Sequence, residues 1–174
     1  MKKSPIKKLE LGPLLDDDSM GLEAGTSSDD HQSIRLWLRL LSCSTDIETE
    51  IRKRLRLQFG MTLARFDYLA QLHRYREGLS MRALSRYLMV TGGNVTALTD
   101  ELEREGAVTR RSSPDDRRSW IVSLTPQGRR AFESMAKEHE EWILGMFSAL
   151  DGATVQQLHA QLGALRVHLL QDEP

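Results

Sequence analysis

Two groups of side chains in the middle of the chain have the chemistry to bind a nucleic acid. The first is Thr91-Gly92-Gly93-Asn94, where short polar side chains stand at the start of an expected helix. Exposed N–H groups at a helix N-terminus suit phosphates and the base edges of a major groove. The second is arginine-rich, with five arginines from Arg104 to Arg118. Guanidinium groups at a hairpin tip can enter a minor groove, although the same arginines could instead pair with Asp115 and Asp116 in a solvated turn.

Two short helices would position the first group. Ser80 is a good N-cap for a supporting helix over 80–88, on which Ala83, Leu84 and Leu88 share one face. Thr91 can cap a second helix, and we expect the two glycines after it to allow a sharp turn and a close approach of another backbone. Apolar residues then recur with helical spacing at Val95, Leu98 and Leu102. This stripe leaves the other side of the helix for solvent or a ligand: Gly93, Asn94, Thr96, Ala97 and Asp100.

A hairpin would position the arginines. Residues 108–111 and 119–124 contain β-branched and apolar side chains, and residues 112–116 between them are dense in turn formers. An ordinary two-helix corner would explain the two helices alone. The hairpin that follows favours a DNA-reading unit instead.

The region resembles the winged helix-turn-helix of the MarR family of bacterial transcription regulators. The residues that match are Leu84-Ser85, Val95-Thr96, Asp100-x-Leu102-Glu103-x-x-Gly106-x-Val108-x-Arg110, Asp116-x-Arg118 and Leu124-Thr125-Pro126-x-Gly128. The resemblance covers residues 31 to 171. It implies a homodimer that binds double-stranded DNA at a palindromic operator. We expect this protein to be a transcriptional repressor that leaves the operator when a small aromatic ligand binds.

We expect the contacts to DNA to come from the exposed start of the second helix and from the hairpin tip. Base and backbone contacts fall on Gly93, Asn94, Thr96 and Ala97, and a phosphate contact falls on Thr91. At the tip, Arg118 and Arg117 would enter the minor groove, with Asp116 orienting Arg118. The family often carries a basic residue at the position of Ala97, so more of the readout here passes to Asn94 and to the wing. Arg110 is expected to pair with Asp100 and lock helix to wing.

The sequence predicts a mainly α protein with a small β-wing and a helical dimerisation region. We expect residues 1–29 to be a flexible tail and 30–171 a MarR-type domain, with dimerisation helices over 30–60 and 125–171 around a winged-helix lobe over 61–124. Helix starts are expected at Asp29 or Asp30, Thr62, Thr125-Pro126 and Asp151. The helix from Thr125 is expected to carry the apolar residues through Phe147 and Leu150. The long apolar stripes of the outer helices require a partner, and a second copy is the simplest one.

Composition sets further bounds. The 174 residues suit one domain, and the net charge is −1, whereas residues 31–174 carry 20 basic against 18 acidic side chains. Attraction to phosphate must therefore come from local clustering at the wing. A single cysteine, Cys43, excludes an intramolecular disulfide framework and is compatible with a reducing cytoplasm. We see no secretory signal and no stretch of transmembrane length, and we expect a cytoplasmic protein without membrane contacts.

A small-molecule effector is the last expectation. Residues 62–70 and 89–96 resemble the subgroup that responds to aromatic acids or hydroxycinnamoyl-CoA thioesters. An apolar slot would be lined by Trp37, Phe66, Trp142 and Met146, and cations would come from Arg35, Arg39, Arg65 and Arg74. The competing interpretation is that these aromatics are core and these arginines face water.

Other kinds of sensor or activity have weaker support. Some family members sense peroxide with a cysteine on the first helix, but Cys43 falls later on that helix, and we expect a buried bystander. The five histidines show no metal-ligand spacing, so no metal and no cofactor is expected. An enzyme is disfavoured because the sequence shows no nucleophile with its base, carboxylate pair or phosphate loop.

Overall fold

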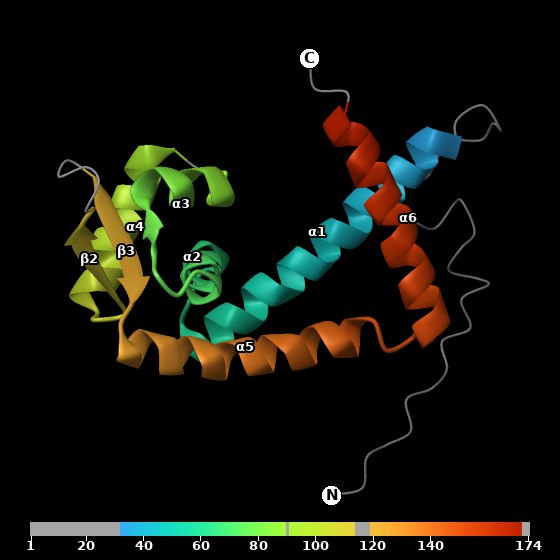
Figure 1. Cartoon of the computed structure of the whole chain (residues 1–174). Helices are drawn as coiled ribbons and strands as arrows, with labels where there is room; N and C mark the ends of the chain where they lie inside the picture. The colour runs from blue at the N-terminus through green and yellow to red at the C-terminus, as the bar shows by residue number, and fades with distance from the viewer. Residues whose placement is uncertain (1–31, 90, 114–118, 172–174) are drawn as a thin grey trace, which may run out of the picture. The chain divides into compact units, whose positions relative to one another are not determined.

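A computed structural model describes residues 32–89, 91–113 and 119–171 (Figure 1). The elements in chain order are α1 (Gln32–Phe59), α2 (Leu63–Arg74), β1 (Leu79–Ser80), α3 (Met81–Leu88), α4 (Gly92–Arg104), β2 (Val108–Ser112), β3 (Trp120–Leu124), α5 (Pro126–Met146) and α6 (Gly152–Gln171). The chain divides into two compact units. One is Glu48–Glu140, called here the lobe, and the other, the terminal unit, contains residues 32–47 and 141–171. The mainly α fold with a small β-wing is confirmed.

Local capping chemistry explains where the helices begin. In each case a side-chain oxygen accepts a hydrogen bond from the backbone N–H three residues later, which satisfies a donor that the helix itself leaves unpaired. The capping residues are Thr62, Ser80, Thr91, Thr125 and Asp151. All five are the capping residues that the sequence predicted. The predicted cap of the first helix, Asp29 or Asp30, lies outside the described residues.

The sheet has one more strand than the sequence suggested. Strand β3 lies between β1 and β2, and both pairs are antiparallel, with Leu79 opposite Val122 and Arg110 opposite Val122 on the other side. The two-residue strand β1 is too short to show an alternating pattern. Gly78 precedes it with φ +89°, and a Cβ there would lie 2.5 Å from the Val122 carbonyl oxygen. Only glycine fits this close approach.

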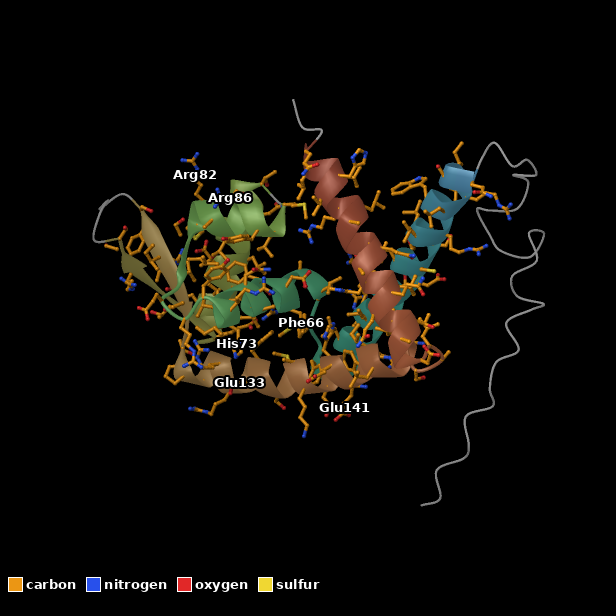
Figure 2. All side chains as sticks on the ribbon, turned by 45° about the vertical axis from the view of Figure 1, so that its right-hand side comes forward. Phe66, His73, Arg82, Arg86, Glu133 and Glu141 are labelled. Carbon is orange, nitrogen blue, oxygen red and sulfur yellow. The ribbon has the colours of Figure 1, made fainter. Side chains whose placement is uncertain are left out.

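The lobe has a closed hydrophobic core. Its fully buried side chains come from α1, α2, α3, α4 and the sheet: Leu55, Tyr68, Leu72, Leu84, Val95, Leu102, Val108 and Val122. Phe66 of α2 packs against Phe132 and His139 of α5, with ring centroids 5.4 and 4.8 Å apart, and burial lowers the pKa of His139. His73 and Glu133 join the same two helices at 3.3 Å (Figure 2).

A buried polar pair lies inside this core. Thr99 is fully buried, and its hydroxyl lies 2.6 Å from both the Val95 carbonyl oxygen and the Tyr68 hydroxyl. If Thr99 donates its only hydrogen to Val95, then Tyr68 must donate to Thr99. Burial raises the pKa of Tyr68 to about 12. The pair ties α2 to the middle of α4.

The terminal unit leaves apolar side chains exposed in the single chain. Helix α6 has no buried residue, and Val155, Leu158, Leu162 and Leu165 are each about 40% exposed. Trp37 of α1 is 60% exposed. Within the described part of the chain, no helix is both long and apolar enough to cross a membrane.

Two expectations for this unit are wrong. Cys43 is exposed rather than buried, because the N-terminal half of α1 has no buried residue in the single chain. Helix α5 ends at Met146, so Phe147 and Leu150 lie in the connection to α6 and not on the helix. The Ser148 hydroxyl donates to the Gly145 carbonyl oxygen at 2.8 Å and supports that turn.

Candidate nucleic-acid interface

Helices α3 and α4 are joined by a tight turn whose geometry differs from the prediction. Met89 is the residue in the left-handed region, with φ 52°, and its N–H donates back to the end of α3. Gly92 and Gly93 instead begin α4 with no positive φ, so the sharp turn does not depend on them. Built on either glycine, a Cβ would meet nothing within 4 Å. The glycines leave open space at the start of α4.

The first two turns of α4 present the predicted contact residues to solvent. Thr91, Gly93, Asn94, Thr96 and Ala97 are all exposed, while Val95 and Thr99 point into the core. The Thr96 hydroxyl donates to the Gly92 carbonyl oxygen at 3.1 Å. The structure therefore brings these five candidates together on one small surface of short side chains.

A network of ion pairs connects α4 to the wing. Arg110 of β2 donates from Nη1 to Asp100 at 2.7 Å and from Nε to Glu103 at 2.9 Å, and its backbone N–H also donates to Glu103 at 3.2 Å. These bonds raise the pKa of Arg110, mainly through Glu103. The predicted pair with Asp100 is confirmed. Glu103 was missed, although its spacing of three residues from Asp100 places both carboxylates on the same side of α4.

The base of the wing is packed through backbone atoms. The Thr125 hydroxyl donates to the Gly106 carbonyl oxygen at 2.7 Å, and the Thr125 N–H donates to Ala107 at 3.0 Å. A Cβ on Gly128 would lie 1.9 Å from the Ala107 carbonyl oxygen. This contact explains the Thr125-Pro126-x-Gly128 motif as a junction between α5 and β2. The tip residues Asp116, Arg117 and Arg118 lie outside the described residues.

The predicted effector residues fall in both units. In the lobe, Arg65 pairs with Glu101 of α4 and with Glu105, the residue that caps the end of α4, and its side chain is only 17% exposed. Phe66 is buried in the core, and Arg74 is exposed at the end of α2. In the terminal unit, Arg35 and Arg39 line a shallow cleft of about 470 Å³ on α1.

The predicted slot residues of the terminal unit differ in exposure. Trp37 is exposed, Trp142 is buried and Met146 is half-buried. In the lobe, by contrast, Phe66 already packs against α5 and Arg65 already forms ion pairs.

A second cleft lies against α4 within the lobe. Its volume is about 470 Å³, and its lining comes from α1, α2, α3 and α4: Glu48, Arg52, Leu63, Ala64, Asp67, Leu88, Asn94, Ala97, Leu98 and Glu101. Burial raises the pKa of Asp67. Asn94 and Ala97 belong both to this cleft and to the exposed start of α4. The sequence placed Trp142 and Met146, which belong to α5, in the lining of the effector site, and it gave no indication that α4 would contribute.

Comparison with known proteins identifies the family. The model of the MarR family matches residues 59–119. The transcriptional activatory protein BadR of Rhodopseudomonas palustris is 32% identical over 123 residues, covering 67% of this chain and 70% of BadR. The chain belongs to the MarR family.

Solved structures agree on the MarR fold. A MarR family transcriptional regulator from Silicibacter pomeroyi is 30% identical, with a TM-score of 0.68, over 82% of this chain and 99% of that one. MepR of Staphylococcus aureus, solved as a complex with DNA, shares the fold with 23% identity and a TM-score of 0.64, over 76% of this chain and 96% of MepR. The chain is therefore a MarR-family transcriptional regulator with a DNA-binding winged helix-turn-helix, as the sequence predicted.

Proposed function

We propose that this chain is a homodimeric regulator that binds a palindromic operator by placing the start of α4 in the major groove. The observation that carries the proposal is the exposed, polar surface of Thr91, Gly93, Asn94, Thr96 and Ala97 at a helix N-terminus. Backbone N–H groups there favour phosphate, and Asn94 can bond adenine in a bidentate manner. The Arg110 network holds the wing at a fixed orientation to α4, so groove and wing contacts form together.

The dimer follows from the terminal unit. Its exposed stripe on α6, together with Trp37 on α1, is costly in water and would be covered by a second copy. A twofold axis would then place two α4 helices in successive major grooves, about 34 Å apart.

The effector is a small aromatic molecule, and the cleft against α4 is the site that we favour for it. A ligand there would contact Asn94 and Ala97 and so distinguish the DNA-bound state from the released one. Such differential affinity is all that release requires. The resemblance to the subgroup suggests a hydroxycinnamoyl-CoA thioester or a free aromatic acid. The sequence interpretation favours a repressor, whereas the name of BadR records activation for that relative.

The first experiment measures binding to DNA upstream of the protein's own gene and to a scrambled duplex, by fluorescence anisotropy. Wild-type protein should prefer the native fragment. Asn94→Ala should weaken that preference by roughly 1 to 3 kcal/mol, because one base contact is lost. Gln127→Ala, an exposed polar change on α5, is the control and should have no effect. Equal affinity of wild type for both duplexes would overturn the proposal.

The effector is tested on the preformed complex by adding the thioester, the free acid and coenzyme A separately. Release by the thioester above the other two supports an acyl-CoA effector, and release by the acid alone moves the assignment to an aromatic acid. Since Cys43 is exposed, oxidant sensing is the second candidate. Cys43→Ser should retain release by the aromatic ligand; release by peroxide that depends on Cys43 would favour the oxidant.

A further inference from the structure

The outer side of α3 carries a cationic and aromatic surface that the candidate site above does not include. We call Arg82, Arg86 and Tyr87 the α3 face. Arg82 and Arg86 are four residues apart, are both exposed, and project outward from the helix (Figure 2). Helix α3 contains no acidic residue. Neither arginine has an ion-pair partner among the residues that the structure describes, unlike Arg65 and Arg110.

Tyr87 is held in place by a stacked pair. The Tyr75 hydroxyl donates to the Tyr87 hydroxyl at 3.0 Å, and the two rings stack with centroids 5.4 Å apart at 22°. Because Tyr87 accepts this bond, its own hydroxyl hydrogen can be donated outward. The Arg86 guanidinium lies over the Tyr87 ring, 5.7 Å from its centroid. A guanidinium and a phenol donor are thus preorganised side by side.

The position of α3 beside α4 and the wing indicates that the α3 face would contact DNA phosphates. Helix α3 ends at Leu88 and α4 begins at Gly92, and α3 also contacts β1 and β3 at the base of the wing. When the second helix of such a pair enters a major groove, the first crosses the sugar–phosphate backbone. The nearest acidic residue before α3 in the sequence is Glu77. This residue is exposed, and its backbone carbonyl oxygen accepts a hydrogen bond from Arg111.

We propose that Arg82, Arg86 and Tyr87 bind backbone phosphates of the operator beside the groove that α4 enters. The inference rests on the proposed DNA-binding function and adds a third anchor to α4 and the wing. Guanidinium–phosphate hydrogen bonds are charge-assisted, and such contacts fix the register of a protein on DNA without reading sequence. The face would therefore contribute affinity and salt dependence but no base preference.

The test compares Arg82→Ala/Arg86→Ala with wild type over a range of salt concentrations, on the operator and on a scrambled duplex. Loss of two phosphate contacts per protomer should make the slope of log K against log salt shallower by about 1.8 per half-site. Affinity for both duplexes should fall together, leaving their ratio unchanged. Arg82→Lys/Arg86→Lys should restore most of the slope, because the charge returns.

Arg130→Ala is the matched control, since it removes an exposed arginine from α5 in the same lobe. Tyr87→Phe keeps the ring and should weaken binding several-fold with no change in slope. A slope for Arg82→Ala/Arg86→Ala that equals that of Arg130→Ala would overturn the inference, including the case in which the α3 face binds an acidic protein. If wild type fails to distinguish operator from scrambled DNA, the proposed function fails instead, whatever the arginine variants do.

Discussion

The lobe and the terminal unit use apolar residues in opposite ways. In the lobe, leucines from α1, α2, α3 and α4 are completely buried, and even the polar Tyr68 and Thr99 satisfy each other inside the core. In the terminal unit, the whole apolar stripe of α6 remains in contact with water in the single chain. Burial of apolar area is the main favourable contribution to folding. The lobe therefore has its own source of stability, whereas α6 has no buried residue in the single chain.

The lobe and the terminal unit also expose two different kinds of surface. The exposed part of α4 is small and polar, and it suits a hydrated partner such as DNA. Helix α6 exposes an apolar stripe along its length, which suits a permanent protein interface. In the proposed dimer, each lobe would form its own DNA-binding surface. A ligand would then regulate binding by changing how the stable dimer holds these two surfaces relative to each other.

The largest expected effect comes from a charge in the α6 stripe. Leu162→Asp should dissociate the proposed dimer, because the change would occur twice across its twofold axis and each leucine buried there would contribute about 1.5 to 3 kcal/mol before the cost of the carboxylate. Light scattering at micromolar concentration should give the mass of one chain. The lobe should keep its folded core, seen as a retained cooperative transition in urea unfolding.

Gln156→Asp provides the matched control for that variant. It introduces the same charge on the same helix, away from the stripe, and should remain dimeric. A dimeric Leu162→Asp protein would contradict the assignment of the α6 stripe to the interface, and a monomeric wild type would contradict the dimer itself.

The next effect contrasts two glycines of the lobe. Gly128→Ala should destabilise the protein by about 3 kcal/mol, because the new Cβ would overlap the Ala107 carbonyl oxygen and the junction must open. Gly93→Ala should change the free energy of unfolding by less than about 1 kcal/mol, since nothing lies near its Cβ and alanine favours helix. Urea unfolding measures both. Equal destabilisation of the two variants would show that the junction tolerates a side chain.

Local features were predictable from sequence. Thr62, Ser80, Thr91, Thr125 and Asp151 cap their helices because a capping bond spans only three residues, and those residues are adjacent in the sequence. The pattern of Val95 and Leu102 likewise gave the buried side of α4. The β-branched residues on both sides of a run of turn formers indicated the hairpin in the same way, and the Arg110–Asp100 pair was anticipated as well.

Features that depend on distant contacts were not predictable. The strand β1 exists only because β3 offers it a hydrogen-bonding edge, and Thr99 is buried because Tyr68 from another helix supplies its partner. Arg65 looked available for a ligand, but it pairs with Glu101 of α4 and with Glu105 at the end of that helix. Cys43 was expected to be buried, because the pattern of apolar residues on a helix does not show whether the same chain or a second copy covers that side of the helix.

The smallest effect tests the polar pair inside the lobe. Tyr68→Phe should cost about 1 kcal/mol near neutral pH, because the hydrogen bond to Thr99 is lost while the ring still packs. In wild type the folded-state pKa of Tyr68 is raised to about 12, above the ordinary value of 10.0. Above pH 10 this tyrosine is therefore ionised in the unfolded chain and still protonated in the folded chain. Its ionisation lowers the free energy of unfolding of wild type, and this loss is absent from Tyr68→Phe, which has no hydroxyl at this position.

The difference in unfolding free energy between wild type and Tyr68→Phe should accordingly be constant up to about pH 9 and should narrow as the pH rises from 10 toward 12. Gln127→Ala, an exposed change that leaves all three tyrosines in place, is the control, and its difference from wild type should not change over the same pH range. Urea titrations at several pH values measure both differences. A gap for Tyr68→Phe that stays constant through about pH 11 would mean that water reaches the Tyr68–Thr99 pair and that the lobe is not closed as the comparison with the terminal unit requires.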